Sequence, residues 1–297
     1  PEEAAPQVER FVRQYYEWVP EEDVSDRSAI DLYGAAVSHW QLGRQRKPGE
    51  VRIRVYNPQH EEHGWQSTHT VIEIVNDDMP FLVDSVTMEL NRLGHGIHLL
   101  VHPILKVRRD GEGILLDVLP QGSEGEGALA ESFMHLEVDR HTEPEVLEEI
   151  RENLLRVLGD VRAAVEDWPE MRARALQIAR EVRENPPPVE EPEEAEETSS
   201  FLEWLAEDHF VFLGYREYEL IEEEGEDALR AVPESGLGIL RRERSRPGVR
   251  RFRDLPPEAR KLVRAPYLLN LTKSNSRSTV HRPSYLDYVG IKRFEDG

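Results

Sequence analysis

Two adjacent carboxylates precede a proline in the stretch NDDMPFLVDSVTMELNRLGHGI, residues 76–97. Asp77 and Asp78 could act as a general acid and base, or supply oxygen ligands to a metal ion. No third oxygen ligand or partner base lies near them in the sequence. The alternative is that Asn76, Asp77 or Asp78 caps the helix after Pro80, because an acidic side chain accepts amide hydrogen bonds at the positive end of a helix dipole. We expect the capping role.

Histidines are the next candidates for a metal site, since His95, His98 and His102 lie in one short run. If residues 97–107 form a strand, His98 and His102 share a face but stand about 13 Å apart at roughly 3.3 Å per residue. His95 points to the other face. The three side chains therefore cannot share one metal ion, and we expect no metal site.

A basic cluster occurs in KSNSRSTVHRPSY, residues 273–285, within an otherwise acidic chain. Its basic members are Lys273, Arg277, His281 and Arg282. Arginine forks fit carboxylates and phosphates, so the cluster could bind an anion or dock an acidic neighbouring domain. A solvated loop is the alternative, and the sequence leaves both open.

Motifs for nucleotide binding and nucleophilic catalysis are missing from the sequence. The glycine-rich segment QGSEGEG, residues 121–127, is acidic and would repel phosphate. No Walker sequence or G-x-S-x-G turn occurs. The chain has no cysteine, which excludes thiolate nucleophiles, disulfides and cysteine-based zinc sites. We therefore expect residues 1–297 to be non-catalytic and to hold no cofactor.

Charge limits the classes of partner. The 297 residues contain 37 Lys and Arg against 59 Asp and Glu, a net charge of −22. Such a field repels polyanions, so we expect neither nucleic acid nor an anionic membrane surface as a partner. No apolar run reaches about 18 residues, the length that spans a bilayer. No targeting segment is evident, so we expect a cytoplasmic protein.

Hydrophobic periodicity predicts the elements that position these residues. Two amphipathic helices are expected at 7–18 and 28–45, followed by a strand at 51–58. The next elements are a strand at 68–75, a helix ending at Gly94, a strand at 97–107 that Pro103 disturbs, a strand at 132–138, a helix from Pro144 to Gly159, and a strand at 161–167 whose composition also suits a helix. This βαββαβ order is typical of a ferredoxin-like α+β domain with two helices on one face of an antiparallel sheet.

Composition divides the chain into four parts. We expect an N-terminal helical segment at 1–45, the ferredoxin-like domain with a trailing helix at 46–184, and a linker at 185–197. The linker sequence NPPPVEEPEEAEE is rich in proline and glutamate, which favours an extended chain. Residues 198–297 are expected to form a second, truncated α/β module, with a helix from 198–200, a strand at 210–220, a helix at 257–264 and strands near 267–271 and 285–294.

Residues 78–97 resemble the pattern of the small-molecule-binding ACT domain, D-x-P-G-L-L-x-x-V-x-x-x-L-x-x-x-G-x-N-I, without a gap. The resemblance implies a groove for an amino-acid effector. Its candidate residues are Asn76, Asp77, Asp78, Met79, Pro80, Phe81, Gly94, His95, Gly96 and Ile97. Phe81 replaces the glycine of the pattern and Gly96 replaces its asparagine, so a packing role in subunit contact competes with ligand binding.

Longer blocks carry a second resemblance. The segments NDDMPFLVDSV, VRAAVEDWPEM, FLEWLAEDHFVFLGYREY and SNSRSTVHRPSYLDYVGIKRF, with His102–Pro103, resemble the N-terminal region of the large bacterial NAD-specific glutamate dehydrogenases. This resemblance implies ACT-like and PAS-like regulatory modules ahead of a distant dehydrogenase domain that uses NAD to convert L-glutamate to 2-oxoglutarate and ammonia. It also implies contact with the rest of the polypeptide and with neighbouring subunits of a homo-oligomer. The alternative is a stand-alone ACT-type amino-acid sensor or adaptor.

Overall fold

The computed structural model describes residues 5–123, 125, 127–186, 193–241, 249–255, 257–265 and 267–293. The chain divides into two compact units, residues 1–159 and residues 160–297. One helix, α6 (Pro144–Glu184), begins in the first unit and ends in the second.

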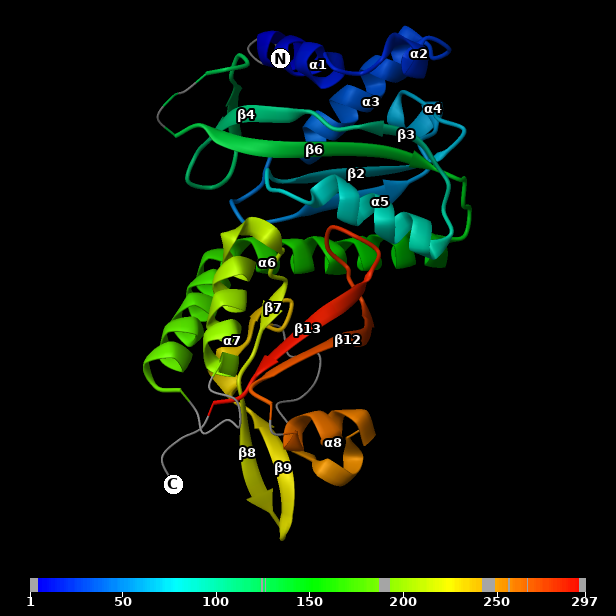
Figure 1. The fold of residues 1–297 in the computed structure, drawn as a ribbon. Helices are drawn as coiled ribbons and strands as arrows, with labels where there is room; N and C mark the ends of the chain where they lie inside the picture. The colour runs from blue at the N-terminus through cyan, green and yellow to red at the C-terminus, as the bar shows by residue number, and fades with distance from the viewer. Residues whose placement is uncertain are drawn as a thin grey trace. The chain divides into compact units, whose positions relative to one another are not determined.

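The first unit contains short helices and one sheet (Figure 1). In chain order its elements are α1 (Ala5–Tyr16), α2 (Glu21–Val24), α3 (Ala29–Leu42), β1 (Arg52–Tyr56), α4 (His60–His63), β2 (Thr70–Asp77), α5 (Leu82–Leu93), β3 (Ile97–Val101), β4 (Ile104–Arg109), β5 (Leu115–Val118), β6 (Leu129–Val138) and the start of α6. The sheet is antiparallel, in the order β1-β2-β6-β4-β5, with β3 also pairing with β6. The predicted α+β class and antiparallel sheet are thus confirmed.

The predicted strand at 97–107 is present but broken into β3 and β4. The break falls at His102–Pro103, where proline has no N–H to give to the ladder. The carbonyl oxygen of Pro103 still accepts from the amide of Phe133 at 3.0 Å, so both pieces stay on β6.

The predicted strand at 161–167 is wrong, because these residues lie inside α6. Gly159 does not end that helix either. Val157, Val161 and Ala164 are buried at helical spacing, and the neighbouring alanines and glutamates favour a helix. The sheet position beside β2 is filled instead by β1, which pairs with β2 in the register Arg54↔Glu73. The edge strand beside β2 is therefore a segment that precedes the βαββαβ elements in the chain, and not the segment that was expected to end them.

Helices cover both faces of this sheet. In Figure 1, α1 and α3 lie on one side of it, and α5 lies on the other together with the first part of α6. The first face buries Phe11 and Tyr15 of α1 against Val75 and Phe133 of the sheet. Buried residues of the second face and its helices include Ile72, Ile74, Leu82, Val86, Leu90, Met134, Leu136, Ile150 and Leu154. The N-terminal helices thus find the partner for their apolar faces on this sheet, within the first unit.

Among its described residues, the second unit contains the end of α6, further helices and three small sheets. Its elements are α7 (Glu193–Trp204), a π-helical turn (Leu205–His209), β7 (Gly214–Tyr215), β8 (Tyr218–Glu223), β9 (Glu226–Ala231), a 3₁₀ turn (Pro233–Ser235), β10 (Leu237–Gly238), β11 (Val249–Arg251), a 3₁₀ turn (Phe252–Asp254), α8 (Pro257–Arg264), β12 (Leu269–Arg277) and β13 (Tyr285–Ile291). The sheets are β10-β7, β11-β9-β8 and β12-β13. Ala179 and Val182 of α6 pack in two small cores with α7.

Two predictions for the second unit need correction. Residues 193–197 belong to α7 and are not extended linker, since Ala195 is buried and the glutamates of the first turn suit the positive end of the helix dipole. Residues 187–192 of the predicted linker lie outside the described residues. The predicted strand at 210–220 is also wrong as one element, because Phe210 to Leu213 form no strand and the remainder is divided between β7 and β8, which lie in different sheets. The helix at 257–264 and the two C-terminal strands are confirmed as α8, β12 and β13.

In the described part of the chain, no helix combines the length and the apolarity needed to cross a bilayer.

Candidate functional site

The first half of the predicted ligand groove lies where β2 leads into α5. Asn76 is buried, whereas Asp78 and Pro80 are exposed. The carboxylate of Asp77 accepts hydrogen bonds from Arg46 Nη2 at 2.7 Å and from the amide of Gly49 at 2.8 Å. This acid therefore anchors the segment between α3 and β1.

The predicted helix cap is wrong. The residue before α5 is Phe81, and its side chain makes no capping hydrogen bond. Phe81 has φ 72° and ψ 2°, in the left-handed region. An L-residue other than glycine pays about 1–2 kcal/mol there. The ACT pattern has glycine at this position because glycine adopts the left-handed conformation without strain. Phenylalanine adopts the same conformation here with backbone strain.

A buried ion network closes this end of the sheet. Arg46 donates to Asp77 and, at 2.7 Å, to Glu131 Oε1. Arg109 donates to both oxygens of Glu131 at 2.7 Å each, and also to the carbonyl oxygen of Gly43 at 2.8 Å. The Arg46 and Glu131 side chains are 0% exposed and that of Arg109 is 2% exposed. Burial lowers the pKa of Arg46, but Glu131 and Asp77 outweigh it and raise the pKa overall. Two cations face two carboxylates, so the network is neutral and its role is to hold loops.

The second half of the groove follows α5. Gly94 has φ 84° and ends the helix, as its sequence predicts. The amide of Gly96 donates to Asp139 Oδ2 at 2.7 Å, and His98 Nε2 lies 2.7 Å from Asp139 Oδ1. Asp139 was not among the sequence candidates, because nothing in its local pattern links it to residues 43 positions earlier.

The two halves do not meet within one copy of the unit. On β6, Asp77 pairs with Glu131 and Ile97 pairs with Val138. These partners are seven residues apart, which is roughly 23 Å at about 3.3 Å per residue. The two halves lie at opposite ends of α5, so one small ligand cannot contact both of them in a single chain.

Histidines gather at the Gly96 end. The rings of His69 and His98 are 4.4 Å apart, and those of His95 and His141 are 4.6 Å apart. Partial burial and the neighbouring His141 lower the pKa of His95. His102 lies away from these pairs and contacts Ser132 Oγ at 2.6 Å. Across the described ranges, no group of three or more His, Asp or Glu side chains is arranged to hold a metal ion.

A polar row under α3, whose members Glu73, His135 and Glu137 are buried, was missed by the sequence analysis. Arg54, Glu73 and His135 pair across β1, β2 and β6, and Glu137 follows on β6. Arg27 binds both oxygens of Glu137. Burial raises the pKa of Glu137, but hydrogen bonds from His135 and Arg27 outweigh burial and hold the pKa well below its ordinary range. The signal for the row was present, since Glu73 interrupts the apolar positions of TVIEIV that face α3.

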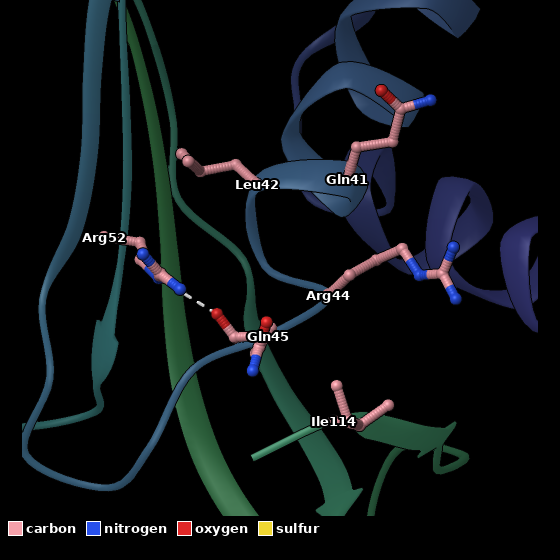
Figure 2. Close-up of a pocket in the computed structure, with 6 residues that line it drawn as sticks. All are labelled: Gln41, Leu42, Arg44, Gln45, Arg52 and Ile114. Atoms are coloured by element: carbon pink, nitrogen blue, oxygen red, sulfur yellow. Dashed lines mark hydrogen bonds between the residues drawn. The ribbon is translucent and has the colours of Figure 1, made fainter. Parts of the chain in front are cut away.

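An open hollow of about 470 Å³ lies at the end of α3. It is lined by Gln41, Leu42, Arg44, Gln45, Arg52 and Ile114 (Figure 2). Arg52 Nε donates to the carbonyl oxygen of Gln45 at 2.9 Å. Arg44 lies over the ring of Trp40 at 5.1 Å, and Figure 2 shows it extending away from Arg52. The hollow is polar and basic, but its two guanidinium groups are not aimed at one point.

The basic cluster of the second unit lies on the hairpin β12–β13. Lys273 Nζ pairs with Asp287 Oδ1 at 2.5 Å, and Arg277 lies over the ring of Tyr285 at 5.2 Å. Arg282 Nε donates to His281 Nε2 at 3.1 Å. Lys273 and Arg277 are thus engaged with the neighbouring strand, and only His281 and Arg282 contact each other.

The antiparallel sheet, the strand–turn–helix at Phe81 and the helix stop at Gly94 together define an ACT-type domain. The family described as "Glutamate dehydrogenase, ACT1 domain" matches residues 11–154. Residues 11–154 of this chain are thus similar to that family.

Whole-chain relatives agree with this assignment. The chain is 43% identical to an NAD-specific glutamate dehydrogenase of Halomonas elongata over 98% of its length, and 40% identical to one of Pseudomonas aeruginosa over 99%. A Mycobacterium tuberculosis protein of the same name is 26% identical over 88% of the chain. The chain spans 18% of the length of the first two relatives. The resemblance to NAD-specific glutamate dehydrogenases is therefore confirmed.

Proposed function

We propose that residues 1–297 form a non-catalytic regulatory and assembly region near the N-terminus of a large NAD-specific glutamate dehydrogenase. The names of the relatives support a parent reaction that oxidises L-glutamate with NAD to 2-oxoglutarate, ammonia and NADH. In this proposal NAD binds in another part of the polypeptide. The parent is a cytoplasmic homo-oligomer, and this region contacts its neighbouring subunits.

The observation that carries the proposal is that both halves of the candidate groove are used within the chain. Asp77 is bound by Arg46 and Gly49, and Gly96 is bound by Asp139. Polar groups that hold loops together in this way favour an architectural role over a site open to a free amino acid.

The catalytic part of the proposal is tested by mixing the purified 297-residue chain with glutamate and NAD. We expect no NADH absorbance, whereas full-length parent enzyme at equal molarity gives a steady rise. NADH formation by the chain alone would overturn the non-catalytic assignment. Light scattering of the full-length enzyme with and without residues 1–297 tests assembly, and an unchanged subunit number would refute that role.

A second candidate function is an amino-acid sensor, which the basic hollow of Figure 2 favours. Arg52 is oriented by Gln45 and pairs with Glu50 at 3.2 Å, so the carboxylate of an amino acid would take the place of Glu50 there. Calorimetric titration with each amino acid tests it. Binding that is lost in Arg52→Gln but kept in Arg13→Gln, whose arginine pairs with Glu9 on the surface of α1, would support the sensor.

A further inference from the structure

The turn between α5 and β3 holds a carboxylate from another segment of the same chain. One oxygen of Asp139 accepts from the amide of Gly96 at 2.7 Å, and the other lies 2.7 Å from His98 Nε2. The amide of Asp139 in turn donates to the carbonyl oxygen of Gly96 at 3.1 Å. Both oxygens of one carboxylate are therefore bound by one backbone N–H and one imidazole.

Glycine at position 96 makes room for this carboxylate. A Cβ atom there would lie 2.9 Å from Asp139 Oδ2 and 3.3 Å from its Cγ. Gly96 is not among the residues with positive φ, so its backbone conformation does not demand glycine. The lack of a side chain at Gly96 is explained by the close approach of the carboxylate.

Solvent reaches this arrangement. The side chains of His98 and Asp139 are 44% and 50% exposed. The hydrogen bonds from His98 and Gly96 lower the pKa of Asp139, so the group is a carboxylate at neutral pH. His69 contacts the ring of His98, and His95 and His141, whose rings contact each other, lie close enough to Asp139 to interact with its charge.

We propose that the Gly96 amide and the His98 imidazole form a carboxylate-binding site that Asp139 fills, so that a small free carboxylate binds there only when Asp139 is displaced or removed. The inference goes beyond the proposed function, because it concerns one surface of the first unit and does not depend on the parent reaction. Hydrogen bonds to an ionised acceptor are stronger than those to a neutral one, and Asp139 already makes two of them. A free carboxylate would also lose translational freedom on binding, which Asp139 does not, so it competes poorly with Asp139.

The test uses formate, the smallest carboxylate, and the amide resonance of Gly96 in the 297-residue chain. In Asp139→Ala we expect formate to shift that resonance saturably, with an apparent affinity at least about ten-fold higher than in the unaltered chain, the equivalent of one charge-assisted hydrogen bond. In Asp139→Asn the amide oxygen still fills the space, so the shift should be absent. Chloride at equal ionic strength should leave the resonance unchanged in every variant.

Two further variants make the result decisive. Asp287→Ala removes an exposed carboxylate elsewhere, on β13, and should not respond to formate at Gly96. Adding His98→Ala to Asp139→Ala should weaken the formate response, since one of its two donors is lost. If Asp139→Ala does not fold, Asp139→Ser serves with the same expectation. Equal responses in the unaltered chain and the alanine or serine variant would overturn the proposal.

Discussion

The buried ion network at the end of β2 gives the sharpest stability prediction. Glu131→Gln keeps the side-chain volume and one acceptor oxygen but removes a charge. Arg46 and Arg109 would then face Asp77 alone, and both arginine side chains are at most 2% exposed. Breaking one partner of a buried ion pair costs about 3–5 kcal/mol. At about 2–4 °C per kcal/mol for a domain of 150–250 residues, the melting temperature should fall by roughly 6–20 °C.

The assay is thermal unfolding followed by tryptophan fluorescence, to which Trp40 and Trp65 in the cores of the first unit contribute. Glu148→Gln is the matched control, because Glu148 pairs with Arg151 on the surface of α6, with side chains 51% and 38% exposed. Exposed pairs of this kind contribute little, so its unfolding midpoint should stay where it is. A midpoint for Glu131→Gln equal to that of the control would refute the reasoning that the network is buried and closed.

Three further predictions follow from single positions. Gly94→Ala should destabilise the first unit by about 1–2 kcal/mol, measured by thermal melting, because φ is 84° there. Gly111→Ala is the control: its φ is not positive and no atom lies within 4 Å of the added Cβ, so its melting temperature should not change. Phe81→Asn should lower the backbone strain at φ 72°, since asparagine tolerates the left-handed region better. Residual dipolar couplings should show a left-handed backbone conformation at residue 81 in both proteins. A right-handed conformation in either protein would contradict the prediction. The pKa of Glu137 is depressed on folding, so its stabilising effect is full above the unfolded value of about 4.5 and is lost as pH falls toward the lower folded pKa. Urea midpoints should therefore fall from pH 7 to pH 3 more steeply in the unaltered chain than in Arg27→Gln, and parallel profiles would contradict this.

Local patterns in the sequence identified most elements of the first unit. The spacing of the apolar residues in α1 and the glycine after α5 are signals within one helix, and each was sufficient. Residues 161–167 misled the analysis because a short run of valine and alanine fits both a strand and a buried helix face. Only packing decides between them, and packing is not a local property.

The candidate site was harder to predict than the fold. The sequence analysis singled out Asp77 and Gly96 as ligand-binding candidates, but their contacts in the structure are with Arg46, Gly49 and Asp139, which come from distant parts of the chain. A spacing pattern gives no distance between such segments. The placement of residues 76–81 and 94–97 at opposite ends of one helix was nevertheless foreseeable, since a helix of 12 residues is about 18 Å long.

The origin of the edge strand affects how quickly the sheet can assemble. With β1 beside β2, the pair Arg54↔Glu73 joins residues only 19 positions apart. A strand at 161–167 in the same place would have required closure of a loop of about 90 residues, which slows the search for native contacts. Placing β1 beside β2, in the position expected for a strand at 161–167, thus lowers the contact order of the domain. A nascent chain can pair β1 with β2 before β6 has been synthesised.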